Sequence, residues 1–89
     1  MMPERTFSHV VAYPLAGDVI EVREHAESDG ELFVAENMLR VISVAEGCVW
    51  FKQYGSGRKN IYTFAEWRAR LEKAVSGEVI RGADHDAPF

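Results

Sequence analysis

The feature that most constrains this chain is a helix start at Thr63, because it fixes both the first residue of an element and its apolar face. Thr63-Phe64-Ala65-Glu66 has the pattern of a capping box, in which the side chains of Thr63 and Glu66 accept hydrogen bonds from each other's backbone amides. Tyr62 and Trp67 stand at the two positions of a hydrophobic staple. Apolar residues then recur at helical spacing: Phe64, Trp67, Leu71, Ala74 and Val75. The sequence therefore predicts a helix over about 64–75, with Gly77 as its C-terminal glycine.

A β-hairpin is predicted just before this helix, over residues 40–54. With Glu46-Gly47 at the turn, the strands pair outward as Ala45 with Cys48, Val44 with Val49 and Ile42 with Phe51. This register predicts a core face of Ile42, Val44, Val49 and Phe51 and an opposite face of Val41, Ser43, Trp50 and Lys52.

Two β-rich runs are predicted upstream, over residues 7–13 and 18–25. In the second run, Ile20 and Val22 alternate with charged residues, which is typical of a strand with one buried face. A proline and a glycine between the two runs indicate a turn.

Residues 31–38 are ambiguous in the sequence. Asp29-Gly30 is a favourable two-residue hairpin turn, which predicts a short strand at 31–35. Ser28 to Glu31 also fits a capping box ahead of Leu32, which would instead start a helix. We favour the strand and leave the helix open.

About five short strands in meander order, followed by one helix, predict an α+β fold. We expect a small bent antiparallel sheet or partly open barrel, with the C-terminal helix at about 64–75 closing one side. The stretch RVISVAEGCVWFKQY and the later YTFAEW resemble the core of short barrel proteins of the Src-homology-three type, common among phage and prophage accessory genes. The resemblance covers residues 40–70; in that family a V-x-V-x-x-G-x-V-x-F hairpin leads to a final short helix, and here Ile42 stands at the first position of the pattern. It implies a non-catalytic accessory role in a bacterial or phage setting.

The length of 89 residues is enough for one small domain. We assign this domain to residues 1–82 and predict a flexible tail over 83–89. The apolar runs are too short to span a bilayer, and the N-terminus lacks the pattern of a signal peptide. A single cysteine excludes an internal disulfide. Together these features predict a cytoplasmic protein.

No motif in the sequence indicates catalysis. Cys48 is tied by no pattern to the three histidines, and the four residues match no zinc spacing. The loop Gly55-Ser56-Gly57-Arg58-Lys59 has the glycines and cations of a phosphate-binding loop. It lacks the order of that motif, because Asn60 follows Lys59 where Ser or Thr is required. We therefore predict no enzyme activity, no cofactor and no metal site.

The positive charge of the chain is concentrated in one segment. The whole chain has a net charge of −4, yet residues 52–73 contain six of its ten Lys and Arg residues. Such asymmetry is typical of an interaction surface, although a solvated helix with i,i+4 ion pairs would show it as well. Arg70 has such a partner in Glu66 and is predicted to be structural.

We therefore predict a small non-enzymatic binding module that contacts a protein partner and regulates or inhibits a host complex. The candidate contact residues are cations and aromatic rings, the side chains on which small interfaces depend: Trp50, Tyr54, Arg58, Lys59, Tyr62 and Arg68. The three cations are predicted to form one patch near the two tyrosines. The alternative is nucleic-acid binding through the basic 52–73 segment, with Trp50 or Tyr54 stacking on bases. The acidic net charge argues against this alternative, and the oligomeric state stays open.

Overall fold

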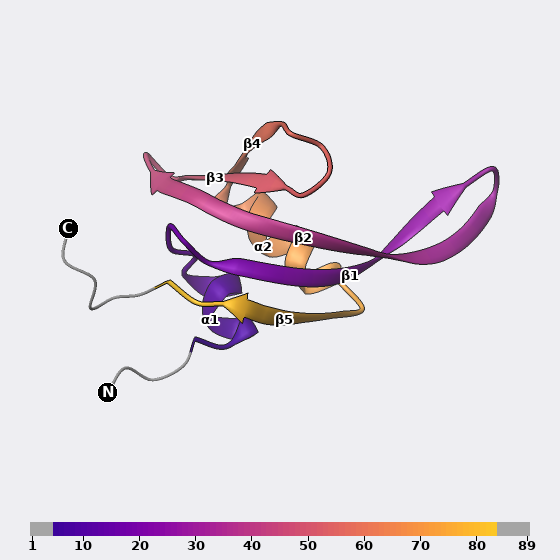
Figure 1. The fold of residues 1–89 in the computed structure, drawn as a ribbon, viewed down its shortest axis with the longest axis horizontal. Helices are drawn as coiled ribbons and strands as arrows, with labels where there is room; N and C mark the ends of the chain where they lie inside the picture. Colours follow the sequence, from indigo (N-terminus) through magenta and orange to yellow (C-terminus); the bar gives the residue numbers. More distant parts are fainter. Residues whose placement is uncertain (1–4, 84–89) are drawn as a thin grey trace.

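The computed structural model describes residues 5–83, which form a five-stranded antiparallel sheet with two short helices on one of its faces (Figure 1). The elements follow one another as α1 (Phe7–Ala12), β1 (Val19–Ser28), β2 (Glu31–Ala45), β3 (Cys48–Gln53), β4 (Lys59–Thr63), α2 (Phe64–Lys73) and β5 (Ser76–Arg81). Across the sheet the strands lie in the order β4-β3-β2-β1-β5. The predicted α+β class is confirmed. The barrel alternative is wrong, because β4 and β5 are opposite edges of an open sheet.

The core lies between the helices and one face of the sheet, which we call the inner face; the opposite face is the outer face. The buried apolar side chains are Val10 of α1, Ile20 and Val22 of β1, Leu39 and Val41 of β2, Val49 and Phe51 of β3, and Trp67 and Leu71 of α2. The ring of Phe51 meets Tyr62 and Trp67 edge-on, at centroid distances of 4.8 and 5.2 Å. The predicted alternation along β1, with Ile20 and Val22 inward, is confirmed.

Helix α2 begins where the sequence predicts. The Glu66 amide donates to the Thr63 hydroxyl at 3.1 Å, and the Thr63 amide donates to the Glu66 carboxylate at 2.9 Å, so the capping box forms. The helix ends at Lys73, two residues earlier than predicted, because the Val75 amide donates to the carbonyl of Arg23 on β1. The chain then continues as β5 along β1. The prediction that this helix is the last element is therefore wrong.

Gly77 lies inside β5 and does not cap the helix. The ring of Phe7 occupies the place where a Cβ atom at this position would lie. A side chain here would push α1 away from the sheet, so the glycine serves the close approach of a helix to an edge strand.

Residues 7–13, predicted as a strand, contain α1 instead. The His9 amide donates to the Thr6 hydroxyl at 3.2 Å, and the Thr6 amide donates to His9 Nδ1 at 3.0 Å. This is a capping box in which histidine takes the place of the usual Glu or Gln. The adjacent Val10 and Val11, which favour a strand locally, pack on the core from the helix, so tertiary contacts override the local preference.

The β2–β3 hairpin has the predicted turn but a different register. Glu46 and Gly47 form the turn with φ values of 55° and 75°, and the two residue pairs next to it form as predicted. A bulge at Ile42 then makes Val41 the partner of Phe51. Val41 therefore takes the core position predicted for Ile42, which is only partly buried.

Asp29 and Gly30 form a two-residue turn between β1 and β2, with positive φ values of 52° and 81°, as a type I′ turn requires. The strand predicted over 31–35 is confirmed, and the helical alternative is wrong. The strand is longer than predicted, because β2 continues to Ala45.

A buried carboxylate joins both ends of the described chain to the sheet. Asp18 is fully buried and accepts hydrogen bonds from the Arg5 guanidinium at 2.8 and 2.9 Å, from the Leu15 amide at 2.9 Å and from the Ala83 amide at 2.8 Å. Such donors offset the cost of removing a charge from water. Ala83, which bonds Asp18 here, is a residue that we predicted to belong to the flexible tail. The rest of the predicted tail, residues 84–89, lies outside the described residues.

We expect Phe51→Ala to lower the free energy of unfolding by about 3–5 kcal/mol, because it removes the ring on which Tyr62 and Trp67 pack. Lys52→Ala, the next residue and on the outer face, should change it by at most about 0.5 kcal/mol. Urea denaturation followed by circular dichroism measures both. Equal effects of the two substitutions would contradict the placement of the core.

Candidate interaction surfaces

The structure places the six predicted contact residues in three locations: the outer face, the connection between β3 and β4, and the inner side with α2. Trp50 and Lys59 alternate with inward-facing residues of β3 and β4 and so lie on the outer face. Tyr54 and Arg58 belong to the exposed connection between these strands. Tyr62 pairs with the buried Val49 and lies on the inner face, and Arg68 is on α2. The predicted patch of Arg58, Lys59 and Arg68 near the two tyrosines does not form, because Lys59 and Arg68 lie on opposite sides of the sheet.

Tyr62 and Arg68 contribute to the packing of the helices. The Tyr62 ring contacts Phe51, as described above, and its hydroxyl lies 3.4 Å from Arg70. The Arg68 guanidinium lies 6.0 Å from the centre of the Phe64 ring and donates to the carbonyl of Ala12 at the end of α1 at 3.2 Å. Arg68 thus bridges the two helices, although its side chain is exposed.

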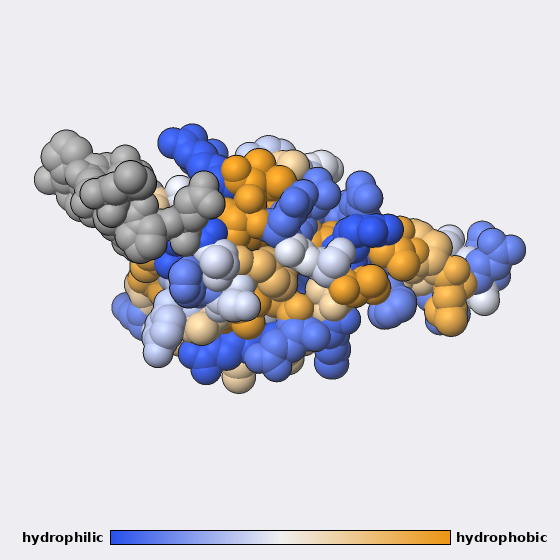
Figure 2. All heavy atoms as spheres, turned by 90° about the horizontal axis from the view of Figure 1, so that it is seen from below, coloured by the Kyte–Doolittle hydropathy of each residue, from blue (hydrophilic) through white to orange (hydrophobic). Residues whose placement is uncertain are grey.

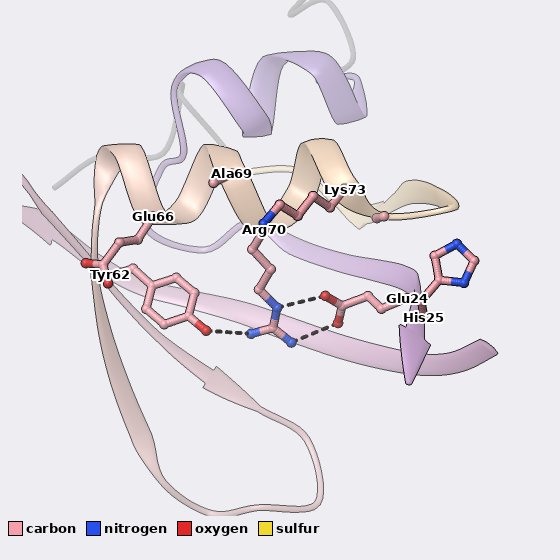
Figure 3. A pocket seen from close by; sticks show the side chains of 8 residues that line it. Glu24, His25, Tyr62, Glu66, Ala69, Arg70 and Lys73 are labelled. Carbon is pink, nitrogen blue, oxygen red and sulfur yellow. Dashed lines mark hydrogen bonds and ion pairs between the residues drawn. The ribbon is translucent and has the colours of Figure 1, made fainter. Parts of the chain in front are cut away.

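Arg70 is structural, as predicted, but its partner is Glu24 on β1 and not Glu66. Its guanidinium binds the Glu24 carboxylate at two points, at 2.9 and 2.8 Å (Figure 3). Glu66 is occupied by the cap of its own helix. The sequence did not indicate this pair, because the two residues are 46 positions apart and meet only when α2 packs on the sheet.

The Arg70–Glu24 pair continues into a polar network along the inner face. Asn37 donates to Glu24 at 2.9 Å, Gln53 donates to Asn37 at 3.1 Å, and Arg70 donates to Gln53 at 3.1 Å. The hydrogen bond from Arg70, helped by that from Asn37, holds the pKa of Glu24 below its usual value. The carboxylate of Glu24 in turn raises the pKa of Arg70. The network borders the apolar core at the end of the part of the inner face that α2 covers.

A shallow cavity of about 740 Å³ opens beside this network, lined by β1, β4 and α2. Figure 3 shows Arg70 reaching across it from the helix towards Glu24 and Tyr62, while His25 lies at its far side. The polar groups at its centre already bind one another. We interpret this cavity as the open border of the structural network.

Three consecutive exposed apolar side chains lie on the hairpin of β1 and β2. The last partner of β1 in β5 is Ser76, opposite Arg23, and the last partner of β2 in β3 is Gln53, opposite Leu39. Beyond these positions the two strands pair only with each other and project from the body (Figure 1). We call residues 25–36 the arm. The arm makes the molecule long, with extents of 48 × 26 × 23 Å.

The arm carries apolar side chains on both of its faces. Leu32, Phe33 and Val34 are 79, 46 and 40% exposed. Because side chains alternate along a strand, Leu32 and Val34 share one face and Phe33 lies on the other. Figure 2 shows, from one side, hydrophobic surface along the narrow extension next to hydrophilic surface. From 25 to 36 the sequence also has four carboxylates and no Lys or Arg.

Among residues 5–83, no helix is long and apolar enough to cross a membrane. Within the same range, no three or more His, Cys, Asp or Glu side chains gather in a way that could hold a metal ion.

Comparison with known proteins does not assign a function to these surfaces. No protein-family model matches the chain, and no curated protein and no solved structure matches it.

The pKa of Glu24 predicts an acid-sensitive fold. A carboxylate with a lowered pKa in the folded state stabilises that state at pH values above its unfolded pKa, and this contribution is lost as the pH falls through the folded pKa. We expect the free energy of unfolding to decrease as the pH falls below about 4.5. Glu24→Gln should lower stability by about 1–3 kcal/mol at pH 7 and reduce its dependence on pH.

Glu72→Gln, on the exposed side of α2, is the matched control and should leave the pH dependence as it is in the wild type. Urea denaturation between pH 3 and 7 measures both variants. The same pH dependence in Glu24→Gln and in the wild type would show that the network does not contribute.

Proposed function

We propose that this chain is a non-enzymatic binding protein that docks its arm onto a partner protein and thereby regulates or inhibits the partner's complex. The observation that carries this proposal is the exposure of apolar side chains on both faces of an element that the rest of the described chain does not cover. Exposed apolar surface of this kind is typical of interaction sites. A hairpin of two strands gains little stability from such side chains by itself.

The charge of the arm indicates the chemistry of the partner surface. The arm has four carboxylates and no Lys or Arg between 25 and 36, and one of the four, Glu36, forms an ion pair with Arg23 at 3.7 Å. A complementary surface is an apolar groove with Lys and Arg side chains at its rim. The apolar side chains would supply affinity, and the carboxylates would orient the arm and speed its association.

The backbone of the arm supports a second contribution to binding. Between residues 25 and 34 each strand of the arm pairs only with the other strand, so both outer edges present backbone donors and acceptors. A partner can extend such a ribbon by adding a strand of its own. Occupation of a groove in this way would exclude the groove's normal ligand, which is how inhibition would arise.

Three expectations from the sequence belong to this proposal. The polar side chains of the inner face bind one another, which supports a role without catalysis. In residues 40–70 the β2–β3 hairpin precedes α2, in line with the order in the phage and prophage accessory proteins that this segment resembles, but β4 lies between the two, β5 follows the helix and the sheet is open. We retain a phage or mobile-element setting and a cytoplasmic location as parts of the proposal.

The test compares the two faces of the arm. We expect Leu32→Thr/Val34→Thr and Phe33→Thr each to weaken binding to a purified partner by tenfold or more, because each removes apolar contacts from one face. Threonine keeps the preference for a strand, so melting temperatures should stay close to that of the wild type. Ile80→Thr on β5, where the side chain is 50% exposed, is the matched control and should bind normally.

The partner is first captured from nuclease-treated lysate, purified, and titrated calorimetrically against each variant. Capture alone does not support the proposal; the loss of affinity in the arm variants does. Equal affinity of all variants for every captured protein would overturn it. A wild-type dimer in solution that the arm variants dissociate would also overturn it, since the occupant would then be a second copy of this chain.

A further inference from the structure

A row of basic residues crosses the outer face of the sheet. Strand pairing places Arg81 of β5 opposite Val19 of β1, Val19 opposite Arg40 of β2, Arg40 opposite Lys52 of β3, and Lys52 opposite Lys59 of β4. We call Arg40, Lys52, Lys59 and Arg81 the cationic row. Three of its members lie on adjacent strands, which are about 4.8 Å apart in a sheet. Neither helix covers this face.

The register that makes this row depends on the bulge at Ile42. An unbroken ladder from the Glu46-Gly47 turn would place Arg40 opposite Gln53. The bulge instead places Arg40 opposite Lys52, and β4 adds Lys59 on the other side of Lys52. Like charges that face each other across strands destabilise a sheet.

Within residues 5–83, the structure gives no member of the row a carboxylate at ion-pair distance; the three ion pairs there involve Arg5, Arg23 and Arg70. The arrangement therefore has a cost that the described part of the fold does not offset. An anion bound across the strands would offset it.

Two hollows follow the row. One, of about 350 Å³, is lined by Arg40, Lys52 and Lys59 together with Gly17 and two residues of β2. The other, of about 200 Å³, lies beside Arg40 and Arg81 and includes Tyr54 in its wall. Both are lined by Arg40 and Gly17, so they adjoin one another along the row.

Aromatic rings flank the row on both of its sides. Trp50 precedes Lys52 by two positions on the same face of β3, and its neighbour on β4 is Ile61. On the other side, the Tyr54 amide donates to the carbonyl of Met38, and the Tyr54 side chain is 56% exposed. Basic grooves with aromatic rings beside them are typical of proteins that bind single-stranded nucleic acids. In such complexes the phosphates contact the cations and the bases stack on the rings.

We infer that the cationic row binds the sugar–phosphate backbone of a single-stranded nucleic acid, with Tyr54 and Trp50 stacking on its bases. This site lies apart from the arm and does not depend on the proposed protein partner. The acidic net charge of the chain is compatible with it, because four carboxylates are in the arm, beyond the row. Glu21 and Glu78, which pair with each other next to Val19 and Arg81, weaken the positive charge at the β5 end of the row, so we expect most phosphate contacts at Arg40, Lys52 and Lys59.

The binding test uses a fluorescein-labelled 20-nucleotide oligothymidylate, followed by fluorescence anisotropy between 50 and 200 mM KCl. About three neutralised phosphates should give log K against log salt a slope of about −2, at about 0.7 per phosphate on a single strand. Lys52→Gln/Lys59→Gln should weaken binding tenfold or more, and Tyr54→Ala about tenfold. Glu21→Gln/Glu78→Gln should tighten it, because two negative charges near the row are removed.

The control is Lys73→Gln, which removes an exposed cation of α2 on the other side of the sheet and should leave affinity unchanged. A second readout separates binding from folding: Lys52→Gln should melt at the wild-type temperature or above it, because a repulsion between strands is relieved, while its affinity falls. A purely structural role would lower both.

Three outcomes would overturn the inference. The first is no binding of the oligothymidylate at 50 mM KCl. The second is equal affinity for a duplex of the same length together with no effect of Tyr54→Ala, which would indicate phosphate recognition without stacking. The third is tighter binding of a poly-glutamate peptide than of the oligonucleotide, which would identify the row as a site for acidic protein.

Discussion

The burial of Trp67 is the interaction on which the rest of this structure depends. Its side chain is fully buried between α2 and the sheet, it packs edge-on against Phe51, and its indole N–H donates to the carbonyl of Val10 at 3.1 Å. One residue thus fixes α2 on the inner face and α1 beside α2. Because an unpaired indole N–H would be costly in the core, the hydrogen bond specifies the position of α1 as well as stabilising it. Gly77, which has no side chain, leaves room for the ring of Phe7 to pack from α1 against β5.

The short length of α2 decides which surfaces remain outside the core. The helix runs only from Phe64 to Lys73, and it covers the inner face as far as the network of Arg70 and Glu24. Beyond that network the β1–β2 hairpin continues as the arm, with apolar side chains on both faces. The outer face has no helix over it and carries the cationic row. Acidic and basic surfaces are thereby separated in space, which is the basis of the two proposals.

Local signals in the sequence were sufficient for the elements whose structure is determined locally. The capping box at Thr63 and the Asp29-Gly30 turn predict α2 and the β1–β2 hairpin because their hydrogen bonds and φ values involve neighbouring residues. The errors arose where distant contacts decide. Residues 7–12 are held as a helix against α2 because the Val10 carbonyl accepts a hydrogen bond from Trp67, 57 positions away. The cap of this helix is local, but its histidine takes the place of the usual Glu or Gln. The chain returns after α2 because β1 offers an unpaired edge to β5.

The candidate sites were less accessible from sequence than the fold. Lys59 and Trp50 lie on the outer face, and period-two alternation puts Tyr62 on the inner face. Arg68 lies on that inner side because α2, which carries it, packs there. Arg40 was not a candidate, since only the bulge at Ile42 brings it beside Lys52. The arm was predicted as a strand, yet no local pattern shows that β3 and β5 stop short of it.

The arm should lie outside the cooperative core and be uncovered in the free protein, and native-state amide hydrogen exchange measures this directly. Amides of the arm between residues 25 and 34 should exchange through local opening, far faster than those of Ile20, Leu39 and Phe51, which exchange only on global unfolding. The rates should not change with protein concentration. Protection of the arm equal to that of the core, or protection that grows with concentration, would contradict the account, because the arm would then already be covered.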